Sequence, residues 1–189
     1  MIMNESRLEK EVIQKALKEG REVNIKPYGG SMLPVIWEGE IIKVVACDVN
    51  SIKPRTIILY WEESKEILIA HRFWKRIDDK LLTKGDASLS RKGFMKVKPE
   101  NVIGQVNQVI KKWGHLNFDW LPMRIWSLLF CYISMIYGTI VHILFRKNAF
   151  FCNKAVALFR KCASLSLRMI YYKQELGRKL GLWGRKVIP

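Results

Sequence analysis

The sequence contains one glycine-rich turn whose serine could act as a nucleophile. This turn lies in residues 28–40, Tyr-Gly-Gly-Ser-Met-Leu-Pro-Val-Ile-Trp-Glu-Gly-Glu. Two glycines precede Ser31 and let the backbone approach a substrate closely, and Pro34 fixes the exit of the turn. The hydroxyl and the backbone N–H of Ser31 can both face a cleft there. Serine is also an ordinary turn residue, so the pattern alone leaves both interpretations open.

A serine hydroxyl needs a neighbouring base before it can attack a carbonyl group. Of the three histidines, His71 is the one that lies within the predicted β region. Ile67, Ile69, His71 and Phe73 follow a two-residue period, which places the imidazole on the inward face of a strand. An inward imidazole is either a hydrogen-bonded core histidine or a base in a cleft.

A carboxylate that could complete this chemistry follows a short predicted strand in the sequence Thr-Lys-Gly-Asp, which ends at Asp86. Asp86 could orient the imidazole and stabilise its charged form. It could equally be a β-turn residue. The four cysteines form no Cys-x-x-Cys pair and have no histidine at ligand spacing. The sequence therefore predicts neither a metal site nor a disulfide framework.

Short alternating strands must position these residues. An amphipathic helix is expected over residues 5–19, and Gly20 is expected to end it. Short apolar runs then recur between turns rich in Gly, Pro and Asp; they lie at 23–25, 41–45, 57–59, 67–73 and 102–110. The pattern predicts a mainly β fold.

The expected organisation has three parts. Residues 1–21 form the N-terminal helix, 22–112 an antiparallel catalytic β domain, and 113–189 a helical, membrane-associated extension.

Together these segments resemble the signal peptidase I clan. More closely, they resemble the branch of signal-peptidase-like enzymes that uses His where the bacterial type uses Lys. The resemblance covers roughly residues 22–110, in the same order and at plausible spacing. The segments that carry it are Gly30-Ser31-Met32-x-Pro34, His71-Arg72, Thr83-Lys-Gly-Asp86 and Val102-Ile-Gly-Gln-Val106.

The resemblance implies an all-β endopeptidase without a cofactor. It would cleave a signal, leader or precursor peptide after small residues. It assigns Ser31 as nucleophile and His71 as general base. We expect the neighbouring turn residues Gly30, Met32 and Pro34 to bind the oxyanion and the substrate.

The chain departs from that family at the third catalytic position. The His-type branch has an Asp about six residues beyond the Gly-Asp motif, but here that position falls near Lys92, in Ser-Arg-Lys-Gly. Either Asp86 orients His71, or the third member of the triad is weak. The family's membrane anchor usually precedes the nucleophile, whereas the apolar segment of this chain follows the β domain.

Residues 125–145 form a 21-residue run without Asp, Glu, Lys or Arg. A bilayer-spanning helix needs about 20 such residues, so we expect a membrane segment; a buried core helix is the alternative. Residues 149–172 follow, with Lys154, Lys161 and Arg168 on one helix face. This basic amphipathic helix is expected to lie at a membrane interface, the alternative being that it packs on the β domain.

The charge distribution favours an anionic membrane surface as a partner. The formal net charge is +16, and residues 146–189 carry eleven Lys or Arg against the single acid Glu175. Basic charge beside apolar helices points to lipid, whereas a nucleic-acid module would carry it on one face of the folded domain. We therefore expect membrane association through a single span or inner-leaflet helices. The side on which the catalytic domain lies stays open.

Two other functions fit parts of the pattern. A non-catalytic, membrane-associated protein could retain the peptidase fold, since an Asp is missing near Lys92. A repressor-type self-cleaving peptidase domain would require a helix-turn-helix and a Lys base. Residues 1–21 hold only one helix, and the base position is His71.

Overall fold

The computed structural model describes residues 5–88, 93–118 and 149–179, together with residues 125, 126, 129, 132, 133, 136 and 137. Within these residues, one eight-stranded sheet has the order β1-β2-β7-β3-β4-β5-β6, with β8 pairing with β7. Every strand pair is antiparallel. The predicted mainly β fold class is therefore confirmed at this level.

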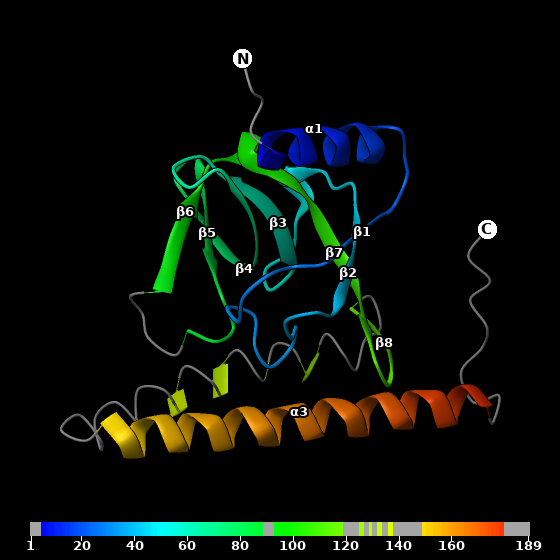
Figure 1. Cartoon of the computed structure of the whole chain (residues 1–189), viewed down its shortest axis with the longest axis vertical. Coiled ribbons are helices and arrows are strands. Elements are labelled where there is room, and N and C mark those ends of the chain that lie inside the picture. Colours follow the sequence, from blue (N-terminus) through cyan, green and yellow to red (C-terminus); the bar gives the residue numbers. More distant parts are fainter. Residues whose placement is uncertain are drawn as a thin grey trace.

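Among the described residues, the α-helix α1 precedes the sheet and the α-helix α3 follows it (Figure 1). In chain order the elements are α1 (Glu5–Lys18), β1 (Val23–Ile25), β2 (Ile41–Val45), η1 (Val49–Ser51), β3 (Ile57–Glu62), β4 (Ile67–Ile77), β5 (Lys80–Lys84), β6 (Phe94–Val97), η3 (Pro99–Asn101), β7 (Val102–Lys111), β8 (Gly114–Asn117) and α3 (Ala149–Lys179).

The sheet buries side chains on both faces. Because successive side chains of a strand point to opposite faces, β3 contributes to two separate clusters. Ile57, Leu59 and Trp61 belong to the larger one, and Ile58 and Tyr60 to the smaller one. A strand buried on both faces shows no alternation of polar and apolar residues, and β3 reads as a continuous apolar run.

Helix α1 covers one end of the sheet and ends as the sequence predicts. Ile13 and Leu17 enter the larger core cluster. Gly20 has φ +76°, a conformation that favours glycine. The Gly20 N–H donates to the Leu17 carbonyl and the Arg21 N–H to the Ala16 carbonyl. These two bonds form the Schellman motif that commonly ends a helix.

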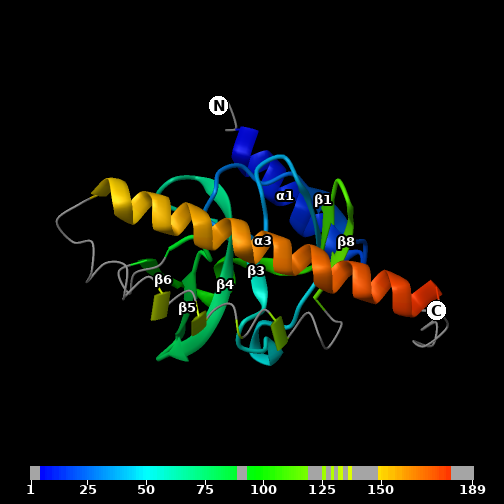
Figure 2. The same ribbon diagram turned by 90° about the horizontal axis from the view of Figure 1, so that it is seen from below.

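Helix α3 lies at the other end of the β domain, on the side opposite α1 (Figure 1). Seen from below, it runs across the domain (Figure 2). Ala163 and Leu167 join the core cluster that holds Val109 and Leu116. The expected helix 149–172 is thus present and continues to Lys179, and one of its faces packs on the β domain.

Within the part of the chain that the structure describes, no helix is long and apolar enough to cross a bilayer. The expected membrane segment 125–145 falls mostly on residues outside the described ones. That expectation stays a prediction.

Candidate active site

The turn that carries Ser31 connects β1 to β2. Gly29 has φ +81°, which explains the requirement for glycine there. The Leu33 N–H donates to the Gly30 carbonyl at 3.2 Å, and the Ile36 N–H to the Met32 carbonyl at 2.9 Å. These bonds tighten the turn while Ser31 stays exposed.

The residues after Ser31 anchor the turn from inside. Met32, Val35 and Ile36 are buried in the larger core cluster. Pro34 is also buried and follows a cis peptide bond. The sequence predicted that Met32 and Pro34 bind substrate, but their side chains are turned into the protein. Gly30 and Ser31, by contrast, are exposed and accessible to a substrate.

His71 comes from the centre of β4, where it pairs with Ile58 of β3. It lies on the strand face that contributes Ile69 and Phe73 to the smaller core cluster, as the alternation predicted. Only 7% of its surface is exposed. The imidazole is thus held between apolar groups.

Gly85, which follows β5, brings the serine turn and the histidine together. A Cβ placed on Gly85 would lie 2.5 Å from the Ser31 carbonyl oxygen and 3.1 Å from Nε2 of His71. The Ala87 N–H donates to the same Ser31 carbonyl at 2.8 Å. Ser31 and His71, forty residues apart in the sequence, therefore both lie next to Gly85, and a side chain at that position would clash with the Ser31 backbone.

Tyr60 is a residue of the site that the sequence interpretation missed. Its hydroxyl lies 3.1 Å from Nδ1 of His71, and the rings meet edge-on with centroids 5.9 Å apart. The Tyr60 hydroxyl also donates to Sδ of Met95 at 3.5 Å. If that hydrogen points to Met95, the Tyr60 oxygen accepts from Nδ1–H, and Nε2 of His71 is left without a proton. That tautomer is the one a general base needs.

Burial sets the protonation of both groups. Desolvation lowers the pKa of His71 to about 4, although the negative charge of Asp86 acts in the opposite direction. Desolvation likewise raises the pKa of Tyr60 to about 12. At neutral pH the imidazole is therefore uncharged and able to accept a proton, and the phenol keeps its own.

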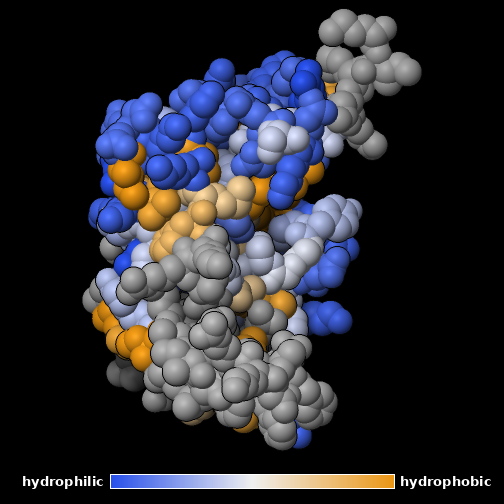
Figure 3. Space-filling view, turned by 90° about the vertical axis from the view of Figure 1, so that its left-hand side faces the viewer, coloured by the Kyte–Doolittle hydropathy of each residue, from blue (hydrophilic) through white to orange (hydrophobic). Residues whose placement is uncertain are grey.

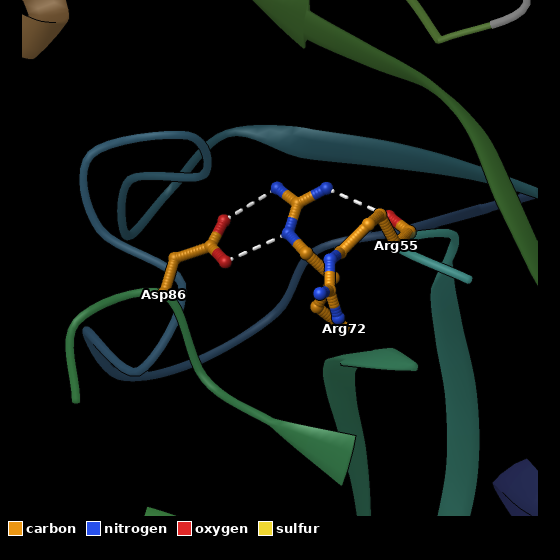
Figure 4. A network of polar contacts seen from close by, with 3 residues as sticks. All are labelled: Arg55, Arg72 and Asp86. Carbon is orange, nitrogen blue, oxygen red and sulfur yellow. Dashed lines mark hydrogen bonds and ion pairs between the residues drawn. The ribbon is translucent and has the colours of Figure 1, made fainter. Parts of the chain in front are cut away.

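Asp86 is paired with Arg72. Its two carboxylate oxygens accept from Nε and Nη2 of Arg72 at 2.8 and 2.6 Å, and both side chains are buried. The Arg72 Nη1 donates to the Arg55 carbonyl at 2.8 Å. Figure 4 shows the planar guanidinium between these two acceptors. Within the described residues no hydrogen bond joins Asp86 to His71, so its influence on the imidazole is electrostatic.

This geometry leaves the reactive groups free. Within the described part of the chain, neither the hydroxyl nor the backbone N–H of Ser31 has a recorded partner, and neither does Nε2 of His71. Ser31, whose backbone carbonyl lies next to Gly85, and a neutral imidazole whose Nε2 lies next to the same glycine are the two residues that base-assisted nucleophilic attack on a carbonyl group requires. Among the described residues, no cluster of His, Cys, Asp or Glu could hold a metal ion.

Comparison of the chain with protein-family models gives no match, and comparison with curated proteins gives none either.

Proposed function

We propose that this chain is a serine endopeptidase similar to signal peptidase I, with Ser31 as nucleophile and His71 as general base. The substrate class would be a signal, leader or precursor peptide cut after small residues. The observation that carries the proposal is that a Cβ on Gly85 would meet both the Ser31 carbonyl and Nε2 of His71, so both groups lie next to this one glycine. It supports a shared site for the two groups.

In the proposed reaction the Ser31 Oγ attacks the scissile carbonyl carbon while Nε2 of His71 takes the hydroxyl proton. The tetrahedral intermediate then collapses, the C–N bond breaks, and His71 returns the proton to the leaving amine. Water, deprotonated by the same nitrogen, then attacks the acyl-serine; the C–Oγ bond breaks, the second product leaves as the acid, and His71 returns the proton to Ser31 Oγ. The backbone N–H of Ser31 can stabilise the oxyanion.

In a Ser-His-Asp triad one carboxylate both orients the imidazole and stabilises the imidazolium. Here two residues would perform these two functions. Tyr60 holds the imidazole in the tautomer that leaves Nε2 free. Asp86, fixed by Arg72, provides the negative charge that favours the imidazolium formed during attack. The exposed turn around Ser31 lets an extended peptide reach the nucleophile.

The test is cleavage of peptides with small residues before the bond, assayed with purified full chain. Ser31→Ala should abolish turnover. Ser51→Ala is the matched control, because Ser51 is an exposed serine whose hydroxyl donates to the Asp48 carbonyl, and it should leave turnover unchanged. If no peptide is cleaved, or if Ser31→Ala retains turnover, the proposal fails. The first outcome would favour a non-catalytic protein with this fold.

A further inference from the structure

Helix α3 carries two apolar rows on different faces. One row is Phe159, Ala163, Leu167 and Tyr171, spaced four apart and packed against the β domain. The ring centroids of Tyr171 and Trp113 lie 5.1 Å apart. The Tyr171 ring also lies so close to the turn between β7 and β8 that a Cβ on Gly114 would be 2.0 Å from it. This row fixes the helix to the domain.

The second row lies on another side of the helix and stays exposed among the residues that the structure describes. It comprises large apolar side chains that are 51% to 63% exposed: Leu158, Leu165, Met169, Tyr172 and Leu176. Spacings of seven, four, three and four residues place them along one side of an α-helix. We call this row the exposed stripe. Contiguous apolar surface of this kind marks an interaction site more often than scattered single residues do.

Positive charge lies directly beside the exposed stripe. Lys154, Lys161 and Arg168 are exposed, and their seven-residue spacing puts them in one row. Lys161 lies between the stripe residues Leu158 and Leu165, three and four positions away. Over its 31 residues α3 holds a single acid, Glu175. An occupant of the stripe would therefore meet a cationic border.

One residue of the exposed stripe, Leu165, also lines a groove beside α3. This groove of about 1060 Å³, lined mostly by apolar groups, lies between α3 and the β domain. Leu165, Lys161 and Arg168 line it from the helix, and Leu33 and Trp37 from the segment that follows Ser31. In Figure 3, hydrophilic residues cover most of the α1 end of the molecule, and hydrophobic ones gather just below it, with smaller groups lower down.

We propose that α3 docks the domain on an anionic bilayer, lying parallel to the surface. The exposed stripe would enter the boundary between headgroups and acyl chains, and the cationic row would contact lipid phosphates. Charge selects this occupant over a second copy of the chain, because two such helices would each bring the exposed row Lys154, Lys161 and Arg168 to the same interface. The inference goes beyond the proposed peptidase activity and does not depend on it.

The test measures partition of the full chain onto vesicles of phosphatidylcholine and phosphatidylserine at 7:3, and onto phosphatidylcholine alone. Wild type should bind the anionic vesicles more tightly. The triple variant Leu158→Gln, Leu165→Gln, Met169→Gln should bind roughly 100-fold more weakly. The matched control is Leu8→Gln, Val12→Gln, which changes exposed apolar residues of α1 and should bind like wild type.

A second readout locates the contact. Cys162 is an exposed free thiol on α3, and in a variant with alanine at the other three cysteines it should react with maleimide more slowly when anionic vesicles are present. Equal binding by wild type and the triple variant would overturn the proposal, as would unchanged Cys162 reactivity. If wild type forms a dimer in the absence of vesicles and the triple variant does not, the exposed stripe binds a second copy of the chain instead of lipid. Ser31→Ala should bind vesicles like wild type. The vesicle assay therefore tests the docking of α3 whether or not the chain cleaves peptides.

Discussion

The Tyr60 hydroxyl and Nδ1 of His71 lie 3.1 Å apart in a buried contact between neighbouring strands. Tyr60 pairs with Ile69, and Ile58 pairs with His71, so the two side chains are diagonal neighbours on one face of the hairpin. A tyrosine is long enough to span that diagonal. Since the phenol is neutral, it can orient the imidazole without adding charge to the site.

Tyr60→Phe removes the hydroxyl and preserves the ring. A neutral hydrogen bond contributes ~0.5–1.5 kcal/mol, so kcat should fall by roughly 2- to 12-fold. KM should change little, because Tyr60 is fully buried and does not meet substrate. Steady-state kinetics on a cleaved peptide measure both constants, and nitrogen NMR of the imidazole should show a loss of the Nδ1–H tautomer.

Tyr28→Phe provides the control for that experiment, because Tyr28 is 88% exposed and lies close to Ser31 in the sequence. Its kcat should equal that of wild type. A Tyr60→Phe variant with unchanged kcat and an unchanged tautomer would show that Tyr60 only fills space.

Asp86→Asn should act chiefly on stability. It leaves the buried Arg72 guanidinium without its charged partner, and breaking such a pair costs ~3–5 kcal/mol. Urea denaturation followed by fluorescence measures this free energy of unfolding. The double variant Arg72→Met, Asp86→Leu removes both charges and should recover most of the loss. An Asp86→Asn protein as stable as wild type would contradict the assigned ion pair.

The pH dependence of kcat/KM follows from the depressed pKa of His71. The neutral imidazole is the active form, and burial lowers its pKa from 6.5 to about 4. Activity should therefore rise with pH through a midpoint near 4 and stay level to neutral pH. A midpoint near 6.5 would mean that His71 is solvated in the active enzyme.

Gly85→Ala tests the junction of the two reactive segments. The added methyl group would meet the Ser31 carbonyl oxygen, a backbone atom that cannot rotate away, as well as the imidazole. A displacement of about 1 Å can reduce activity by ~10²-fold, and we expect a loss of kcat/KM of that size. Ala87→Gly, which keeps the N–H that binds Ser31, should be much milder. Full activity of Gly85→Ala would show that Ser31 and His71 do not depend on this contact.

The strand that presents His71 could be predicted from sequence, because Ile69 and Phe73 share its face in a clear two-residue period. The partners of His71 could not. The strand β3 is buried on both faces, so nothing in its sequence distinguishes Tyr60 from its neighbours until the register with β4 is known. Asp86 was predicted near the site, but the neighbouring Arg72 offers a bidentate partner that an imidazole cannot match.

For helix α3, the sequence could not decide which side of the helix packs against the domain. Its sequence predicted a basic amphipathic helix, and the apolar side that includes Leu158, Leu165 and Met169 is exposed. The row around Ala163 and Leu167 packs instead. Both rows are apolar enough to be buried, so helical periodicity could locate the helix without deciding which side faces the domain.

A double-mutant cycle on Ser31 and His71 tests the proposed activity most directly. The quantity to measure is kcat/KM for one cleaved peptide, in wild type, Ser31→Ala, His71→Ala and the double variant. Groups that act as one unit are strongly non-additive, so each single variant should lose nearly all activity and the double variant should be little worse. Retention of more than about a tenth of the activity by His71→Ala, or losses that simply multiply, would contradict the Ser31–His71 pair.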